Sequence, residues 1–149
     1  MSSFYVGIDP GKSGALAVVG DEWCNAFSFS EENYIVVLNS IREKIALAVV
    51  ERVGAMPKQG VVSTFKFGQN FGWTLGVLAT LKIPYELILP KTWKKEFGCT
   101  SDKNTSIDVA KRLFPDVSLM RTERCTTPHD GKAEALLMAE YARRLRERA

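Results

Sequence analysis

The chain has 149 residues, of which 46% are hydrophobic and 25% charged, a composition typical of one globular domain with a proper core. No apolar run approaches the roughly 20 residues that a membrane span needs, and the N-terminus lacks the pattern of a signal peptide. The net charge of +3 is too small to indicate a nucleic-acid partner by itself. Three widely spaced cysteines predict reduced thiols in a cytoplasmic protein, with no zinc site and no disulfide framework. We therefore predict a single domain over residues 1–149.

The first part of the chain alternates short apolar runs with turns. Runs at 4–9, 15–19 and 23–29 are separated by only a few residues, too few for crossover helices. They predict three antiparallel strands joined by turns. Ser30 then occupies the expected N-cap of a helix that should run to about Lys44.

The rest of the chain alternates strands with helices. Residues 45–50 are apolar throughout, as in a strand buried on both faces, and Glu51 ends the run. One more strand is predicted over 85–89, where Pro90 stops it, and three more helices over 67–82, 102–114 and 129–148. This order predicts an α/β domain of the ribonuclease-H-like class, with a mixed five-stranded sheet and helices on both faces.

The predicted helix over 67–82 carries an unusual pattern. Gly68, Gly72 and Gly76 recur every four residues and therefore form one stripe. Such a stripe predicts close packing against a neighbouring element. The aromatic residues Phe65, Phe67, Phe71 and Trp73 favour helix core and a dimer interface over base stacking.

Four acidic residues are candidates for chemistry. Asp9 and Glu51 each end a predicted strand, where catalytic groups commonly lie. Asp130 and Glu134 are four residues apart at the start of the last helix, so they project from one face. Each observation alone also fits a solvated acid or an acid that interacts with the helix dipole.

Together, these acids would need a cation. Four converging carboxylates repel one another unless positive charge neutralises them. Oxygen ligands without a Cys/His cluster suit Mg²⁺ or Mn²⁺. A pair of such ions can activate water and stabilise the leaving oxygen in phosphodiester hydrolysis.

Basic residues gather in two places. Lys91, Lys94 and Lys103 lie in the third quarter of the chain and are the better candidates for phosphate contact. Lys103 is the strongest of them, because it stands at a predicted helix start, where backbone N–H groups also favour anions. The C-terminal group (Arg143, Arg144, Arg146 and Arg148) is explained by the preference for cations at a helix C-terminus.

An ordered set of motifs makes the chain resemble the RuvC-type Holliday junction resolvases. The motifs are Gly7-Ile8-Asp9-Pro10-Gly11 with Ser13-Gly14-Ala15, Val50-Glu51, Phe67-Gly68-Gln69, Pro90-Lys91 with Trp93-Lys94, and His129-Asp130-Gly131-Lys132-Ala133-Glu134-Ala135-Leu136. The resemblance spans nearly the whole chain. It is closest to the phage and chloroplast branch, whose last motif carries an Asp and a Glu four apart, whereas the bacterial enzymes place these acids three apart.

The resemblance implies a homodimer that binds a four-way DNA junction and nicks two opposing strands, in recombination and repair. Asp9, Glu51, Asp130 and Glu134 would hold Mg²⁺, two ions per site, with Mn²⁺ able to substitute, and His129 could assist as a ligand or near the attacking water. DNA contacts are predicted for Lys58, Lys91, Lys94, Lys103 and Met56. Such an enzyme is expected in the cytoplasm of a bacterium or a phage-infected cell, or in an organelle after removal of a transit peptide.

Two alternatives stay open. The same acids would serve a ribonuclease-H-like nuclease acting on RNA–DNA hybrids or on RNA. A non-catalytic junction-binding protein is the other alternative, although all four ligand positions are filled. An actin-like or sugar-kinase phosphotransferase needs two such domains and is excluded by length. The bacterial enzymes carry an aromatic residue after this Glu that helps to open the junction. Here either Met56 or Phe65 acts as the apolar wedge, or the junction is opened differently.

Overall fold

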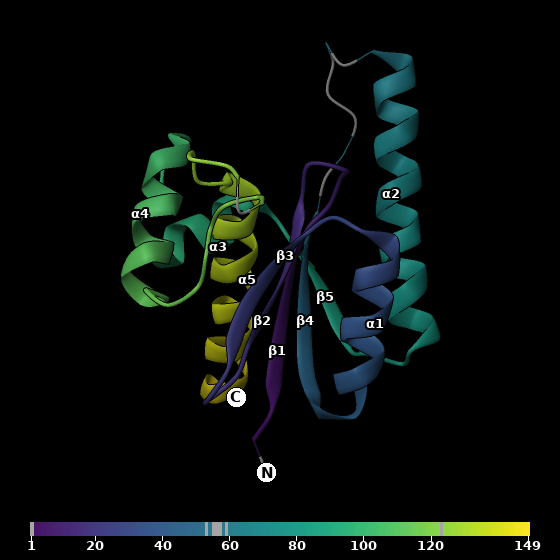
Figure 1. Cartoon of the computed structure of the whole chain (residues 1–149). Helices are drawn as coiled ribbons and strands as arrows, with labels where there is room; N and C mark the ends of the chain where they lie inside the picture. Colours follow the sequence, from purple (N-terminus) through teal and green to yellow (C-terminus); the bar gives the residue numbers. More distant parts are fainter. Residues whose placement is uncertain (1, 53, 55–57, 59, 123) are drawn as a thin grey trace.

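A computed structural model describes residues 2–52, 54, 58, 60–122 and 124–149. Five strands form one sheet in the order β3-β2-β1-β4-β5 (Figure 1). Strands β1 (Phe4–Asp9), β2 (Ala15–Val19) and β3 (Cys24–Ser28) pair antiparallel, while β4 (Ile45–Glu51) and β5 (Tyr85–Ile88) run parallel to β1. The predicted mixed five-stranded sheet is confirmed, with β1 at its centre.

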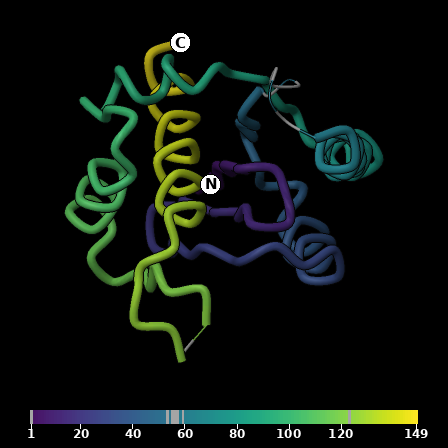
Figure 2. Tube along the Cα trace, turned by 90° about the horizontal axis from the view of Figure 1, so that it is seen from above, coloured from purple at the N-terminus to yellow at the C-terminus, as the bar shows by residue number. Residues whose placement is uncertain are grey.

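Helices cover both faces of the sheet, as predicted. They are α1 (Glu31–Ile41), α2 (Val61–Thr80), α3 (Pro90–Phe97), α4 (Lys103–Leu113) and α5 (Asp130–Arg148). Helices α1 and α2 lie on one face, and α5, flanked by α3 and α4, lies on the other (Figures 1 and 2). In the described ranges, no helix combines the length and the apolar character needed to cross a membrane.

Two predicted helix boundaries need correction. Helix α2 starts at Val61 rather than at residue 67, because β-branched residues lower helix propensity in its first turn and masked the true start. The helix predicted to reach Lys44 ends at Ile41 and continues as one 3₁₀ turn, although Ser30 is its N-cap and accepts a hydrogen bond from the Asn33 backbone.

Helix α3 was not predicted at all. Pro90 stands at its first position, where proline is compatible with a helix because the missing N–H has no intrahelical partner there. Gly98, with φ of 67°, ends the helix in the left-handed conformation. The residue that stops β5 is therefore also the start of the next helix.

Alternation along β1 decides which side chains reach α5. Val6 and Ile8 are buried against α1 and α2. Gly7 faces the other side, where an added Cβ would lie 2.1 Å from the Ala135 carbonyl oxygen of α5. The backbones of β1 and α5 are therefore in direct contact, and Asp9, two residues after Gly7, faces the same helix.

The prediction that the glycine stripe packs against a neighbouring element is wrong for the elements of this chain that the structure describes. A Cβ added at Gly68, Gly72 or Gly76 would meet nothing within 4 Å in the described part of the molecule. The stripe points outward because α2 packs on the sheet through its opposite side, which buries Asn70, Thr74 and Leu78.

The C-terminal arginines do more than interact with a helix dipole. Arg144 and Arg148 reach across from α5 to Glu96 on α3, at 2.9 and 2.7 Å. Arg143 and Arg144 also pair with the buried Glu140 of α5. These ion pairs fix α3 against α5, which places the Trp93 side chain of α3 in the core beside the sheet.

Candidate metal centre

Asp9 and Glu51 leave the sheet side by side. In the parallel pairing of β1 with β4, Ile8 lies opposite Val50, so the next residue of each strand is one of these acids. Val49, two residues before Glu51, is buried against α5. Because side chains alternate along a strand, both acids are directed to the α5 face.

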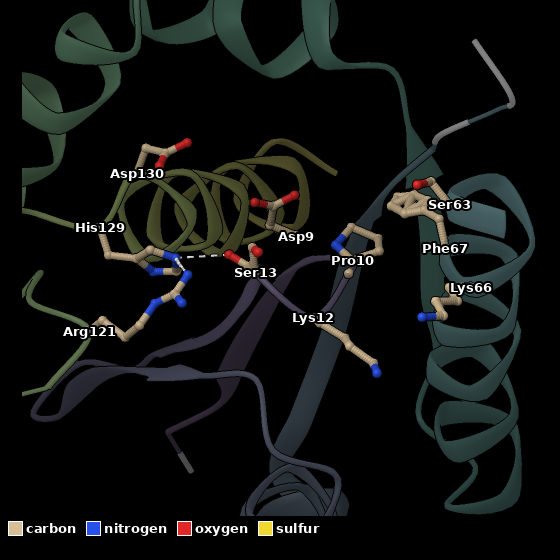
Figure 3. Close-up of a pocket in the computed structure, with 12 residues that line it drawn as sticks. Asp9, Pro10, Lys12, Ser13, Ser63, Lys66, Phe67, Arg121, His129 and Asp130 are labelled. Carbon is tan, nitrogen blue, oxygen red and sulfur yellow. Dashed lines mark hydrogen bonds between the residues drawn. The ribbon is translucent and has the colours of Figure 1, made fainter. Parts of the chain in front are cut away.

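Asp130 and Glu134 approach the same place from α5. Asp130 is its first residue, with a side chain 44% exposed, and the Glu134 side chain, about one turn later, is only 5% exposed. Figure 3 shows Asp9 and Asp130 on the lining of one groove, with Asp130 at the start of α5. The direct contact at Gly7, beside Ala135, sets this spacing.

The acids influence one another electrostatically. The pKa of Asp9 is raised well above its usual range, first by burial and then by the carboxylates of Glu134 and Glu51, with a smaller effect from Asp130. Burial also raises the pKa of Glu51, and Glu134 adds to this. Glu51, Asp130 and Glu134 therefore all lie within electrostatic range of Asp9. Among the described residues, however, no three acidic, histidine or cysteine side chains are positioned to ligate one ion as they stand.

A lysine stands inside this cluster. Lys103, the first residue of α4, places its Nζ 3.1 Å from Glu134 Oε1 and 3.4 Å from Asp130 Oδ2. Its charge lowers the pKa of Asp9, against the raising effects of burial and the other acids. The residue predicted as the best phosphate contact is thus an ion-pair partner of two of the predicted metal ligands.

Glu51 is oriented by the α3 helix. The Trp93 indole, fully buried, donates a hydrogen bond from Nε1 to Glu51 Oε1 at 3.1 Å. This bond lowers the pKa of Glu51 and partly offsets burial. Lys94, with Nζ 5.6 Å from the centre of the Trp93 ring, acts in the same direction. Trp93 belongs to one of the sequence motifs, but its role depends on α3, a helix that the sequence pattern did not predict.

His129 immediately precedes α5 and contacts the turn after β1. Its Nε2 lies 2.8 Å from the Ser13 carbonyl oxygen and 3.0 Å from Arg121 Nη2 (Figure 3). A carbonyl oxygen only accepts, so Nε2 carries the hydrogen in the Ser13 contact. Burial and the charge of Arg121 lower the pKa of His129, which favours this neutral form. His129 therefore connects the Asp130 end of α5 to the turn that follows Asp9.

A groove of about 540 Å³ opens beside Asp9 and Asp130. Three exposed cationic side chains line it: Lys12, Lys66 and Arg121. None was predicted, because each belongs to a different segment and only the fold brings the three together. Proximity to the motif Asp9-Pro10-Gly11 was the available signal for Lys12.

The turn carrying Lys12 is attached to α2. The Gly11 backbone, at φ of 111°, donates a hydrogen bond to Asn70 Oδ1 at 2.8 Å. Only glycine adopts such a φ without strain. Of the other predicted DNA contacts, Lys58 and Lys91 are exposed, and Met56 lies outside the described residues.

The residues present fit a hard divalent cation. The donors are all carboxylate oxygens, which Mg²⁺ and Mn²⁺ prefer. Burial and mutual repulsion raise the pKa of Asp9, as expected where acids await a neutralising charge. The Lys103 ammonium already places one positive charge between Asp130 and Glu134.

No family model matches the chain, and no curated protein matches its sequence. Solved structures do match its fold. T. thermophilus RuvC in complex with a Holliday junction substrate has a TM-score of 0.63 at 15% identity, over 96% of this chain and 96% of that chain. A structure of Thermus thermophilus RuvC has a TM-score of 0.62 at 17% identity, over 97% and 96%. The mixed five-stranded sheet with helices on both faces is the fold of these RuvC structures, so the fold that the motifs predicted is confirmed.

Proposed function

We propose that this chain is a metal-dependent endonuclease that resolves four-way DNA junctions by paired phosphodiester hydrolysis. The observation that carries the proposal is the position of the half-buried Asp9, at one end of the sheet, within electrostatic range of Glu51, Asp130 and Glu134. The fold shared with RuvC, one structure of which contains a Holliday junction substrate, supplies the substrate class.

In this proposal, Asp9, Glu51, Asp130 and Glu134 hold Mg²⁺, two ions per site, and Mn²⁺ substitutes. The bound ions supply an activated water and stabilise the charge on the leaving oxygen. The chain's own residues provide the geometry: Trp93 fixes the Glu51 carboxylate through its indole N–H. His129 ties the start of α5 to Ser13, which keeps Asp130 at a fixed place relative to the β1–β2 turn.

The groove beside the acids is the proposed path of the cleaved strand. Lys12, Lys66 and Arg121 line it, and cationic side chains of this kind bind phosphates without reading sequence. Lys91, Lys94 and Lys58 are proposed to extend this contact to the junction arms. The Arg121 guanidinium lies beside His129 and lines the same groove as Asp9 and Asp130, so a phosphate bound by Arg121 would lie close to the acid cluster.

The proposed assembly is a homodimer formed through the outward side of α2. This side carries the open glycine stripe together with Val61, Val62 and Phe65, which are 86%, 67% and 67% exposed. An uncharged surface of small and apolar residues lets another helix approach closely. A second copy of the chain is the occupant that a symmetric junction requires, because two opposing strands must be cut. Phe65, at the groove end of this helix, is the described candidate for opening the junction.

Digestion of matched substrates tests the proposal. A four-way junction, a duplex, a flap and an RNA–DNA hybrid are incubated with the protein in Mg²⁺ and in Mn²⁺. We expect symmetric nicks in the junction and little cutting of duplex. Preferred cutting of the hybrid would establish the ribonuclease alternative. Absence of both metal-binding heat and cleavage would establish the non-catalytic alternative.

Asp9→Asn separates catalysis from binding. The variant should lose at least about a thousandfold in cleavage, as when a group essential to the chemistry is removed. Junction binding, measured by gel shift, should be unchanged or tighter because one negative charge near the DNA is gone. Loss of binding together with cleavage would mean that Asp9 is structural.

A further inference from the structure

Among the described lysines, Lys103 is the one whose ammonium forms an ion pair with a carboxylate. Its side chain is 58% exposed, yet its ammonium contacts the Glu134 carboxylate, whose side chain is 5% exposed. It reaches Asp130 at the same time. In all the other ion pairs between described residues, the cation is an arginine.

The buried acid depends on this contact. The hydrogen bond from Lys103 Nζ, 3.1 Å long, is the one that the Glu134 carboxylate receives in the described part of the chain. A buried carboxylate without a partner is costly. Lys103 therefore satisfies Glu134 in the protein without metal, and it reaches in from the start of α4, a separate element.

We propose that Lys103 is an internal counter-ion, which occupies a cation position of the acid cluster in the metal-free protein and is displaced when a divalent ion binds. The inference rests on the metal site proposed above. The oxygens that Lys103 contacts, Glu134 Oε1 and Asp130 Oδ2, belong to two of the four proposed ligands. An ammonium group and a divalent cation repel each other and compete for the same oxygens, so binding of the ion requires Lys103 to leave.

The fold allows this exchange. The Lys103 side chain enters the cluster from solvent, since more than half of it is exposed, so it can withdraw without unpacking the core. Lys94 contrasts with it, because its ammonium lies over the Trp93 ring and makes no ion pair in the described structure. Once displaced, the Lys103 ammonium is available to a DNA phosphate beside the metal. Metal loading thus converts a residue that stabilises the empty site into a residue that contacts DNA.

Metal binding to the DNA-free protein tests the inference. Lys103→Met is compared with Lys111→Met, which removes the same charge from the exposed C-terminal turn of α4. Calorimetric titration with Mn²⁺ should give about fivefold to tenfold tighter binding for Lys103→Met, the equivalent of removing a partly exposed competing ion pair. In EDTA, the same variant should melt at a lower temperature than wild type. Lys111→Met should change neither value appreciably.

A second measurement uses the unaltered protein. Acylation of the Lys103 amine by a water-soluble ester, followed by peptide mapping, should be faster with Mg²⁺ than in EDTA, whereas Lys111 should react equally in both. Unchanged Mn²⁺ affinity in a folded Lys103→Met, or equal labelling of Lys103 with and without Mg²⁺, would overturn the inference. If Lys103→Met does not fold, the labelling experiment decides.

The two proposals fail in different ways. If wild type binds Mn²⁺ and Asp9→Asn binds it much more weakly, the metal site stands whatever Lys103 does. Unchanged affinity in Lys103→Met would then reject only the counter-ion. If wild type and Lys103→Met both give no binding heat, the metal site itself is rejected, and the counter-ion with it.

Discussion

The two longest helices, α2 and α5, lie on opposite faces of the sheet and use their surfaces in opposite ways. Eleven of the 19 residues of α5 are buried, including the charged Lys132, Glu134 and Glu140. Only three of the 20 residues of α2 are buried. Helix α5 contacts β1 backbone to backbone at Gly7, whereas the glycines of α2 face open space. Burial fixes side chains where acids must be placed precisely, and openness leaves a helix available to a partner.

Gly7→Ala should give the largest effect, because it attacks the contact that distinguishes α5. The added Cβ would lie 2.1 Å from the Ala135 carbonyl oxygen and 2.4 Å from the Ala139 nitrogen, both of them backbone atoms. We expect a loss of about 3 kcal/mol or more in the free energy of unfolding, measured by urea denaturation. A change below about 0.5 kcal/mol would mean that α5 moves away easily and does not fix the site.

Trp93→Phe should give a smaller effect, confined to the acids on the α5 face. The change keeps an aromatic ring in the core but leaves a small cavity and removes the hydrogen bond to Glu51. We expect about a tenfold loss of metal affinity, as for other residues that orient metal ligands, measured by titration with Mn²⁺. Trp73→Phe on the α2 face is the matched control, because Trp73 packs among Phe29 and Tyr34. Equal losses in both variants would point to general loosening of the fold.

The pH dependence of stability should report on the acids of the α5 face in the unaltered protein, without a substitution that changes side-chain volume. Folding raises the pKa of Asp9 and of Glu51, so the folded state binds protons that the unfolded state has already released. Stability of the metal-free protein should therefore fall as pH rises above the ordinary carboxylate range towards these raised values. Thermal denaturation in EDTA between acidic and neutral pH measures this. Asp9→Asn should flatten the fall, and an unchanged slope would place the cause elsewhere.

Gly72→Ala should give the smallest effect, and one of opposite sign. Among the described residues, no atom beyond the adjoining helix backbone lies within 4 Å of the added Cβ. Alanine favours a helix interior over glycine, so the chain should gain about 0.5–1 kcal/mol. Urea denaturation at low protein concentration measures the gain. In sedimentation experiments, the same methyl group should weaken the proposed dimer. Destabilisation of the monomer would show that the stripe is packed after all.

The sequence predicted the features that depend on neighbouring residues. Strand runs, their order and the Ser30 cap follow from local patterns, and each is found in the structure. Asp9 and Glu51 could be placed at one edge because two strands end there. Their electrostatic coupling to Asp130 and Glu134 followed from the motif order and is consistent with the raised pKa of Asp9.

Features that depend on packing were beyond the sequence. The stripe of Gly68, Gly72 and Gly76 and the single Gly7 look alike in sequence, yet only Gly7 lies under another backbone. The pairing of Lys103 with Glu134 joins residues 31 positions apart and depends on how α4 lies against α5. Helix α3 was missed because Pro90 ends a strand and begins a helix at the same position.

The hydrogen bond from the Gly11 backbone to Asn70 connects α2 to the turn that follows Asp9. Asn70 belongs to the buried side of α2, and Gly11 belongs to the turn two residues after Asp9. A displacement of α2 when a second copy or a DNA arm presses on it would be transmitted to that turn through one rigid amide. In the proposed dimer, this bond would link the position of α2 mechanically to the position of the turn beside Asp9.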